Sequence, residues 1–158
     1  SLMKAVVYWI AQFVGAIAAA LVVRFVVPEG TNLGVTTGSL TVSNLGGAAL
    51  LEGILAFLLV STIYQAAVFG KAGNLAPVAI GFTLAGLILA VGVYTGASAN
   101  PARTLGPALI AGDLSYVPAY LVGLFAGGIL AGLLHTYVIG SVQEEAPKIE
   151  PGERIANR

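Results

Sequence analysis

The hydrophobic pattern of the chain consists of four long apolar stretches separated by short polar segments. Each stretch holds about 20 or more residues with few strongly polar interruptions, the length that an α-helix needs to cross a hydrocarbon core roughly 30 Å thick. The predicted spans cover residues 4–27, 48–69, 75–94 and 117–139. The pattern therefore predicts an all-α membrane protein.

A further apolar segment, residues 101–111, is too short to span a bilayer. Eleven helical residues rise about 16 Å, so a helix here ends inside the membrane, where its free N–H groups need protein or water as partners. Asn100 suits the N-cap and Pro101 the first helical position. Arg103 follows Asn100 by three residues, so the two side chains leave roughly the same face. We therefore expect a half-helix whose N-terminus directs an amide and a guanidinium at one polar space.

Composition narrows the class of protein further. Apolar residues make up 58% of the 158 residues and charged residues 9%, and the mean hydropathy of +0.94 excludes an ordinary soluble domain. The formal net charge is zero, so the chain lacks a basic footprint for nucleic acid. With no cysteine and one histidine, the sequence favours neither an enzyme nor a metal or cofactor site.

The half-helix and its approach resemble a known family. Asn100, Pro101, Ala102 and Arg103, preceded by the sequence Tyr-Thr-Gly and followed by a Gly-Pro pair, are similar to the second signature loop of the aquaporins. The alternatives are a soluble turn with a surface arginine and an arginine that extends to the membrane interface. The resemblance implies an aquaporin-like helical bundle, with four spans and one re-entrant half-helix in this chain and six plus two in the full protomer.

The resemblance covers nearly all of residues 3–140, as the family's third to sixth helices. Residues 8–16 resemble the opening of the third helix, and Glu52 resembles a buried glutamate of the fourth. We expect residues 1–140 to form the membrane region, and the first two helices and first Asn-Pro-Ala to come from a longer protein or from a second polypeptide. Residues 141–158, charged and containing two prolines, are expected to form a cytoplasmic tail.

The resemblance also implies roles for individual residues. Asn100 would donate its amide to a passing water molecule, and Glu52 would support the signature loop. The expected selectivity filter consists of Arg103, Ile88 and Ala97. The carbonyls expected to accept hydrogen bonds from water are those of Gly96, Ala97 and Ser98. The positive N-terminus of the half-helix and the arginine would repel cations and protons. The implied mechanism is passive conduction and includes no catalytic step.

These features together predict a passive channel for water, with small neutral solutes as further candidates. Isoleucine and alanine would make the constriction less polar than in a strict water pore, whereas Thr104 replaces the aspartate typical of glycerol facilitators. A glycerol facilitator and a non-conducting membrane scaffold are the alternatives. We expect a homotetramer in the cell membrane, with Lys4, Lys71 and the C-terminus on the cytoplasmic side because positive charges favour that side.

The sequence also leads us to expect an internal repeat and specific roles for three polar residues in the spans. Residues 8–21 and 120–133 share six identical residues, which suggests that the first and last spans are equivalent parts of two inverted repeats. Gln12 is expected to form a hydrogen bond between helices and Arg24 to extend to the membrane interface. His135 is expected to be an interfacial residue.

Overall fold

The computed structural model describes residues 1–140, and the expected tail, residues 141–158, lies outside the described residues. The described part is helical and contains no strand. Its α-helices are α1 (Leu2–Val26), α2 (Ser39–Ser43), α3 (Leu45–Ile63), α4 (Ala76–Thr95), α5 (Pro101–Ala111) and α6 (Val117–Leu133). Short π-helical or 3₁₀ segments extend them, namely η1 (Tyr64–Val68), η2 (Gly73–Leu75) and η3 (Leu134–Ile139).

All four predicted spans are present as helices long and apolar enough to cross a membrane. With their extensions they cover Leu2–Val26, Leu45–Val68, Gly73–Thr95 and Val117–Ile139. Each boundary lies within a few residues of the prediction, because glycine, proline and charged residues interrupt the apolar runs at these places. The prediction of an all-α membrane protein is confirmed.

The predicted half-helix is also confirmed, as α5. Asn100 has an extended backbone and its side-chain oxygen accepts a hydrogen bond from the N–H of Ala102 at 2.8 Å, while Pro101 occupies the first helical position. Gly112 ends α5 in the left-handed conformation, with φ of 80°, as is common after a helix C-terminus. The local sequence therefore sets both ends of this short helix.

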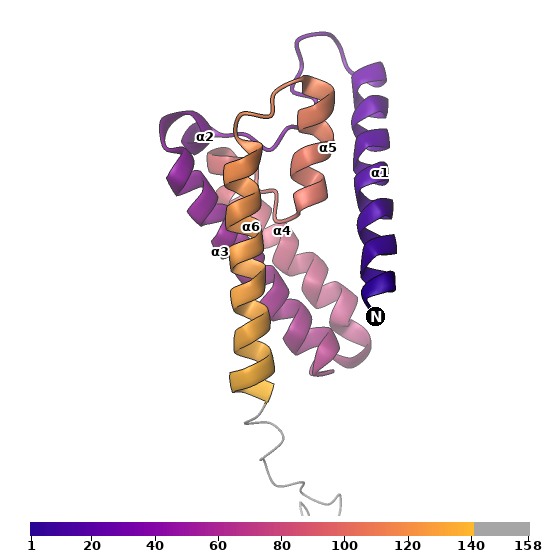
Figure 1. The fold of residues 1–158 in the computed structure, drawn as a ribbon, viewed down its shortest axis with the longest axis vertical. Coiled ribbons are helices and arrows are strands. Elements are labelled where there is room, and N and C mark those ends of the chain that lie inside the picture. The colour runs from indigo at the N-terminus through magenta and orange to yellow at the C-terminus, as the bar shows by residue number, and fades with distance from the viewer. Residues whose placement is uncertain (141–158) are drawn as a thin grey trace, which may run out of the picture.

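α5 lies alongside one half of α1 (Figure 1). Asn100, at the start of α5, contacts Gln12, near the middle of the 25-residue α1. Further along, Gly106 packs directly on the backbone of Ala16, where a Cβ atom would come within 2.7 Å. Consequently, the N-terminus of α5 is level with the middle of a membrane-length helix, as expected of a half-helix.

The last span packs against α5 from another side. In Figure 1, α1 and α6 flank α5 and run in opposite directions. This arrangement agrees with the expectation that the first and last spans are equivalent parts of two inverted repeats.

α3 and α6 cross in direct backbone contact. A Cβ atom on Gly127 would lie 1.9 Å from the carbonyl oxygen of Gly53, and one on Gly123 would lie 2.0 Å from that of Ala49. Small residues allow the two backbones to lie this close together. In lipid, where hydrophobic burial does not drive helix association, such close packing holds the helices together. The crossing fixes α3, which carries Glu52, relative to α6.

The connection between α1 and α3 contains the short helix α2, which the sequence analysis does not predict. The N–H of Gly38 donates to Thr41 Oγ1 at 2.9 Å, and Asn44 caps α3 through Gly47. Five residues are too few for a helical hydrophobic period to be visible in the sequence. This connection therefore has a defined structure on the face of the molecule where α4 ends.

The environment of His135 differs from the one expected, that of a residue at the membrane interface. Its side chain is buried, and Nδ1 lies 2.9 Å from the carbonyl oxygen of Ala131. The rings of Tyr64 and Phe69 lie against the imidazole, with centroids 5.3 and 6.2 Å away. Because α3 and α6 cross so closely, their π-helical extensions remain in contact and cover the ring.

Candidate functional site

The site is built around the segment between α4 and α5, which Glu52 of α3 holds. Glu52 is fully buried, and its two carboxylate oxygens accept hydrogen bonds from the N–H groups of Ser98 and Ala99, each at 2.9 Å. A buried carboxylate is costly unless donors satisfy it, and these two N–H groups supply them. The carboxylate therefore ties the loop to a spanning helix.

The backbone of this segment adopts conformations that most residues avoid. Ala97 and Ala99 have φ values of 45° and 51°, and Gly96 has a φ of 78°. Left-handed conformations cost free energy for residues with a Cβ atom and persist only where the surroundings enforce them. Here the enforcing contacts include Glu52 on one side and Thr95, whose Oγ1 accepts from the N–H of Ala97 at 3.1 Å, on the other.

Ser98 connects the loop to the first turn of α5. Its hydroxyl donates to the carbonyl oxygen of Asn100 at 2.8 Å and lies 2.6 Å from Thr104 Oγ1. The N–H of Asn100 in turn donates to Ser98 Oγ at 3.3 Å. Both Ser98 and Thr104 are buried. The loop and the half-helix thus form one hydrogen-bonded unit.

The Asn100 side chain is held at both of its polar atoms. Its oxygen caps α5, while Nδ2 donates to Gln12 Oε1 of α1 at 3.5 Å. The expectation that Gln12 bonds between helices is confirmed. A small cavity of about 210 Å³ adjoins this pair and is lined by Trp9, Phe13 and Phe125 among others. The amide is therefore fixed in orientation beside open space.

Arg103, one turn into α5, extends toward the connection between α1 and α3. Its guanidinium donates a hydrogen bond to the carbonyl oxygen of Gly34, where the left-handed φ of 81° favours glycine. No local sequence pattern indicates this partner, since Gly34 lies 69 residues away in the chain. The connection between α1 and α3 therefore takes part in positioning the arginine.

The remaining predicted filter residues occupy different environments. Ala97 is buried within the loop, whereas Ile88 lies on α4 about two turns before its C-terminus and is 45% exposed. No group of three histidine, cysteine, aspartate or glutamate side chains within residues 1–140 is arranged to hold a metal ion. The site thus consists of amide, hydroxyl, guanidinium and backbone groups around one fixed carboxylate.

Arg24 has a partner that the sequence did not reveal. It was expected to extend to the membrane interface, but its guanidinium donates to the carbonyl oxygen of Ile110 at 2.9 Å. The last carbonyls of a helix lack intrahelical partners, so a nearby cation stabilises that end. α1 therefore contacts both ends of α5.

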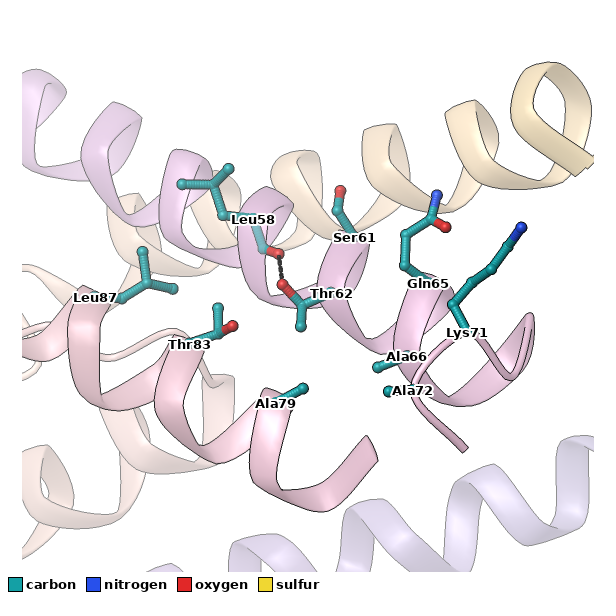
Figure 2. A pocket seen from close by; sticks show the side chains of 10 residues that line it. All are labelled: Leu58, Ser61, Thr62, Gln65, Ala66, Lys71, Ala72, Ala79, Thr83 and Leu87. Carbon is teal, nitrogen blue, oxygen red and sulfur yellow. Dashed lines mark hydrogen bonds between the residues drawn. The ribbon is translucent and has the colours of Figure 1, made fainter. Parts of the chain in front are cut away.

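A separate groove of about 550 Å³ runs between α3 and α4 (Figure 2). Figure 2 shows side chains from both helices along it, among them Leu58, Thr62, Thr83 and Leu87, with Lys71 near one end. The Thr62 hydroxyl donates to the carbonyl of Leu58 at 3.0 Å. None of the predicted site residues lines this groove, so it is distinct from the loop that Glu52 holds.

The fold and the loop together define a multi-pass helical membrane protein with a re-entrant half-helix. Comparison with known proteins gives its family: the model of the major intrinsic proteins matches residues 1–135. The chain therefore belongs to the major intrinsic protein family, which also confirms its resemblance to the aquaporins.

Three relatives illustrate the similarity. The chain is 41% identical over 143 residues to "Probable aquaporin TIP2-2" of Oryza sativa subsp. japonica, covering 87% of this chain and 55% of the relative. It is 43% identical over 143 residues to "Aquaporin TIP2-3" of Arabidopsis thaliana, covering 86% and 55%. It is 44% identical over 143 residues to "Probable aquaporin TIP2-1" of Oryza sativa subsp. japonica, covering 88% and 56%. The chain thus spans a little over half the length of these relatives.

Proposed function

We propose that this chain forms part of a passive transmembrane channel for water and small neutral solutes. The observation that carries the proposal is the half-helix α5, whose N-terminus and capping residue Asn100 lie level with the middle of α1. A helix end at this depth requires polar partners, and a file of water molecules supplies them. The aquaporin relatives support the same function.

In the proposed mechanism, Asn100 donates from its fixed amide to each passing water oxygen. The carbonyls of Gly96, Ala97 and Ser98 accept the hydrogens of the water file. Their availability is supported by the hydrogen bonding of the loop, in which the N–H groups of Ala97 and Ser98 are engaged and no described residue donates to these carbonyls. The positive end of the α5 dipole opposes cations and a protonated water chain.

Arg103, Ile88 and Ala97 would form the constriction that selects the solute. The guanidinium donates to water and repels cations, while isoleucine and alanine give the opposite wall an apolar character. This composition favours water and small neutral molecules over ions. A glycerol facilitator remains the second candidate, because apolar filter walls suit a carbon backbone as well.

We propose that the working channel needs helices beyond those described here. The relatives are nearly twice as long as the matched region, and the amide of Asn100 borders an open cavity rather than a closed pore. The mostly apolar groove between α3 and α4 offers a surface for a second protomer, in agreement with a homotetramer. The proposed setting is the cell membrane, with the C-terminus cytoplasmic.

Osmotic measurements test the function. The complete natural chain that carries residues 1–158 is reconstituted in proteoliposomes, and their shrinkage in hypertonic sucrose is followed by light scattering. We expect faster shrinkage than in empty vesicles and an unchanged proton leak. Swelling in glycerol and in urea separates a facilitator from a water channel. If correctly folded protein leaves the shrinkage rate unchanged, the channel function is wrong and the scaffold alternative is favoured.

A further inference from the structure

A polar pocket of about 310 Å³ lies where the C-terminal ends of α1 and α5 meet. It is lined by Arg24 of α1, by Glu29 of the connection that follows and by the end of α5 at Ile110, among others. Figure 1 shows the two helix ends at the same end of the molecule, where the connection leaves α1. None of the proposed pore or filter residues lines this pocket, so it is a separate site.

Two opposite charges line this pocket without pairing with each other. The guanidinium of Arg24 donates to the carbonyl oxygen of Ile110 at 2.9 Å. Within residues 1–140 this is the only hydrogen bond of the Arg24 side chain, and the Glu29 side chain has neither a hydrogen bond nor an ion pair there. Because a guanidinium has five N–H donors, most of those of Arg24 remain available. The pocket therefore offers both cationic donors and an anionic acceptor to a ligand.

A hydrogen-bonded turn fixes the backbone at Glu29. The N–H and the hydroxyl of Thr31 both donate to the carbonyl oxygen of Pro28, at 3.3 and 2.7 Å. Gly30, between them, has a left-handed φ of 82°, which glycine adopts without steric cost. The carboxylate is therefore attached to a defined turn directly after α1.

The part of α1 beside the pocket is apolar and exposed. Val22, Phe25 and Val26 are all exposed, Phe25 to 89%. Arg24 lies two residues before the end of a helix long enough to cross a membrane, so the pocket lies at the depth of the lipid head groups. A ligand with both charges at one end and apolar chains at the other, as in a phospholipid, matches this arrangement.

We propose that this pocket binds the zwitterionic head group of an ethanolamine phospholipid. Arg24 donates to the phosphate oxygens, Glu29 accepts from the primary ammonium group, and the acyl chains lie along Phe25 and its apolar neighbours. A choline head group has the same two charges, but its trimethylated nitrogen has no N–H to donate. The site therefore prefers ethanolamine to choline. This inference goes beyond the proposed channel function and does not depend on it.

Native mass spectrometry tests the preference. The complete natural chain that carries residues 1–158 is purified in detergent at low ionic strength, because salt screens exposed charges. It is then given equal amounts of dioleoyl phosphatidylethanolamine and dioleoyl phosphatidylcholine. We expect bound ethanolamine lipid to exceed bound choline lipid about fivefold, the size of one exposed charged contact. Equal binding of the two lipids overturns the proposal.

Substitution of the carboxylate locates the preference. Glu29→Gln brings the ratio of the two bound lipids close to one, because the ammonium group loses its charged partner. Asp113→Asn is the matched control: it removes a carboxylate from the exposed turn after α5 but keeps an oxygen that accepts from the N–H of Ser115, and it retains the preference. A preference that survives in Glu29→Gln shows that this pocket is not the site.

Substitution of the arginine tests the phosphate contact. Arg24→Gln lowers the binding of both lipids, since both carry the phosphate, whereas Arg24→Lys keeps a cation and retains binding. Thermal midpoints measured in lipid-free detergent show that each variant is folded, and Glu29→Gln matches the unchanged protein there. Undiminished binding to folded Arg24→Gln contradicts the phosphate contact.

Glycerophosphoethanolamine, which has the head group without acyl chains, identifies the source of the ligand. We expect it to displace the lipid only at far higher concentration, because it lacks the chains that lie along α1. If it competes as strongly as the intact lipid, the site takes a soluble phosphate ester and the lipid assignment is wrong. Water permeability does not enter these measurements, so failure of the channel function and failure of this inference are separate results.

Discussion

Asn100 and Gln12 meet where a half-helix ends beside the middle of a full span, with Nδ2 of the asparagine 3.5 Å from Oε1 of the glutamine. Since the asparagine oxygen is occupied by the N–H of Ala102, the glutamine determines where the second polar atom of the amide points. This single contact links the depth of α5 in the membrane to the orientation of its cap.

The first prediction concerns that contact. Gln12→Leu removes the acceptor at similar volume, so the Asn100 amide loses one fixed orientation and water permeability per channel falls several-fold. Gln65→Leu, in the groove between α3 and α4, is the control and retains permeability. Stopped-flow light scattering, normalised to the amount of reconstituted protein, gives the comparison. Equal permeability in both variants would show that Gln12 does not position the amide.

Glu52→Gln tests the support of the loop. A glutamine can accept from one N–H group but presents its own NH₂ to the other, and each hydrogen bond to a charged group contributes about 1.5–3 kcal/mol. We expect a lower thermal midpoint in detergent and an order-of-magnitude loss of water permeability. Glu29→Gln, in the exposed connection after α1, serves as the control. Retention of both properties by Glu52→Gln contradicts the support role.

The crossing of α3 and α6 predicts a sharp difference between two neighbouring glycines. Gly127→Ala places a Cβ atom 1.9 Å from the carbonyl oxygen of Gly53, whereas Gly128→Ala meets only a Val60 methyl group at 3.9 Å. Overpacking of this kind costs about 1–3 kcal/mol or more. Thermal unfolding in detergent should therefore show a lowered midpoint for Gly127→Ala alone. Similar midpoints would contradict the direct backbone contact.

Arg24→Leu tests the contact at the other end of α5. The substitution removes the donor to the carbonyl of Ile110 while leaving an apolar side chain on α1. Because the pair is exposed, the expected loss of stability is small, about 1 kcal/mol or less. Hydrogen exchange should nevertheless quicken in the last turn of α5 and remain unchanged in its first turn. Faster exchange throughout α5 would instead indicate general loosening.

The sequence alone predicts those structural elements that are determined by residues close together in the chain. The spans followed from apolar length, and α5 followed from Asn100, Pro101 and the glycine after Ala111, because capping chemistry depends on neighbours in the chain. The half-helix could thus be located to the residue. The role expected for Glu52 as a support of the loop came from a family resemblance rather than from any local pattern.

The partners of the long polar side chains could not be predicted in the same way. Arg24 bonds to Ile110, Arg103 to Gly34, and Tyr120 to Thr41 and Thr95, at separations of 25 to 86 residues. Such pairs arise only when the helices take their places, and no periodicity or spacing records them. The short helix α2 was missed for a different reason, since its five residues complete little more than one turn.

The contact between Gly53 and Gly127 has a consequence for biosynthesis. The ribosome delivers α3 and the re-entrant segment before α6, so the helix bearing Glu52 enters the bilayer without the neighbour that later locks its position. Until Gly127 has been translated, α3 lacks its contact with α6, so the position of Glu52 is not yet fixed. The loop between α4 and α5, which is bonded to Glu52, is then not fixed either. Final seating of α5 should therefore be a late event of membrane insertion, following the arrival of the last span.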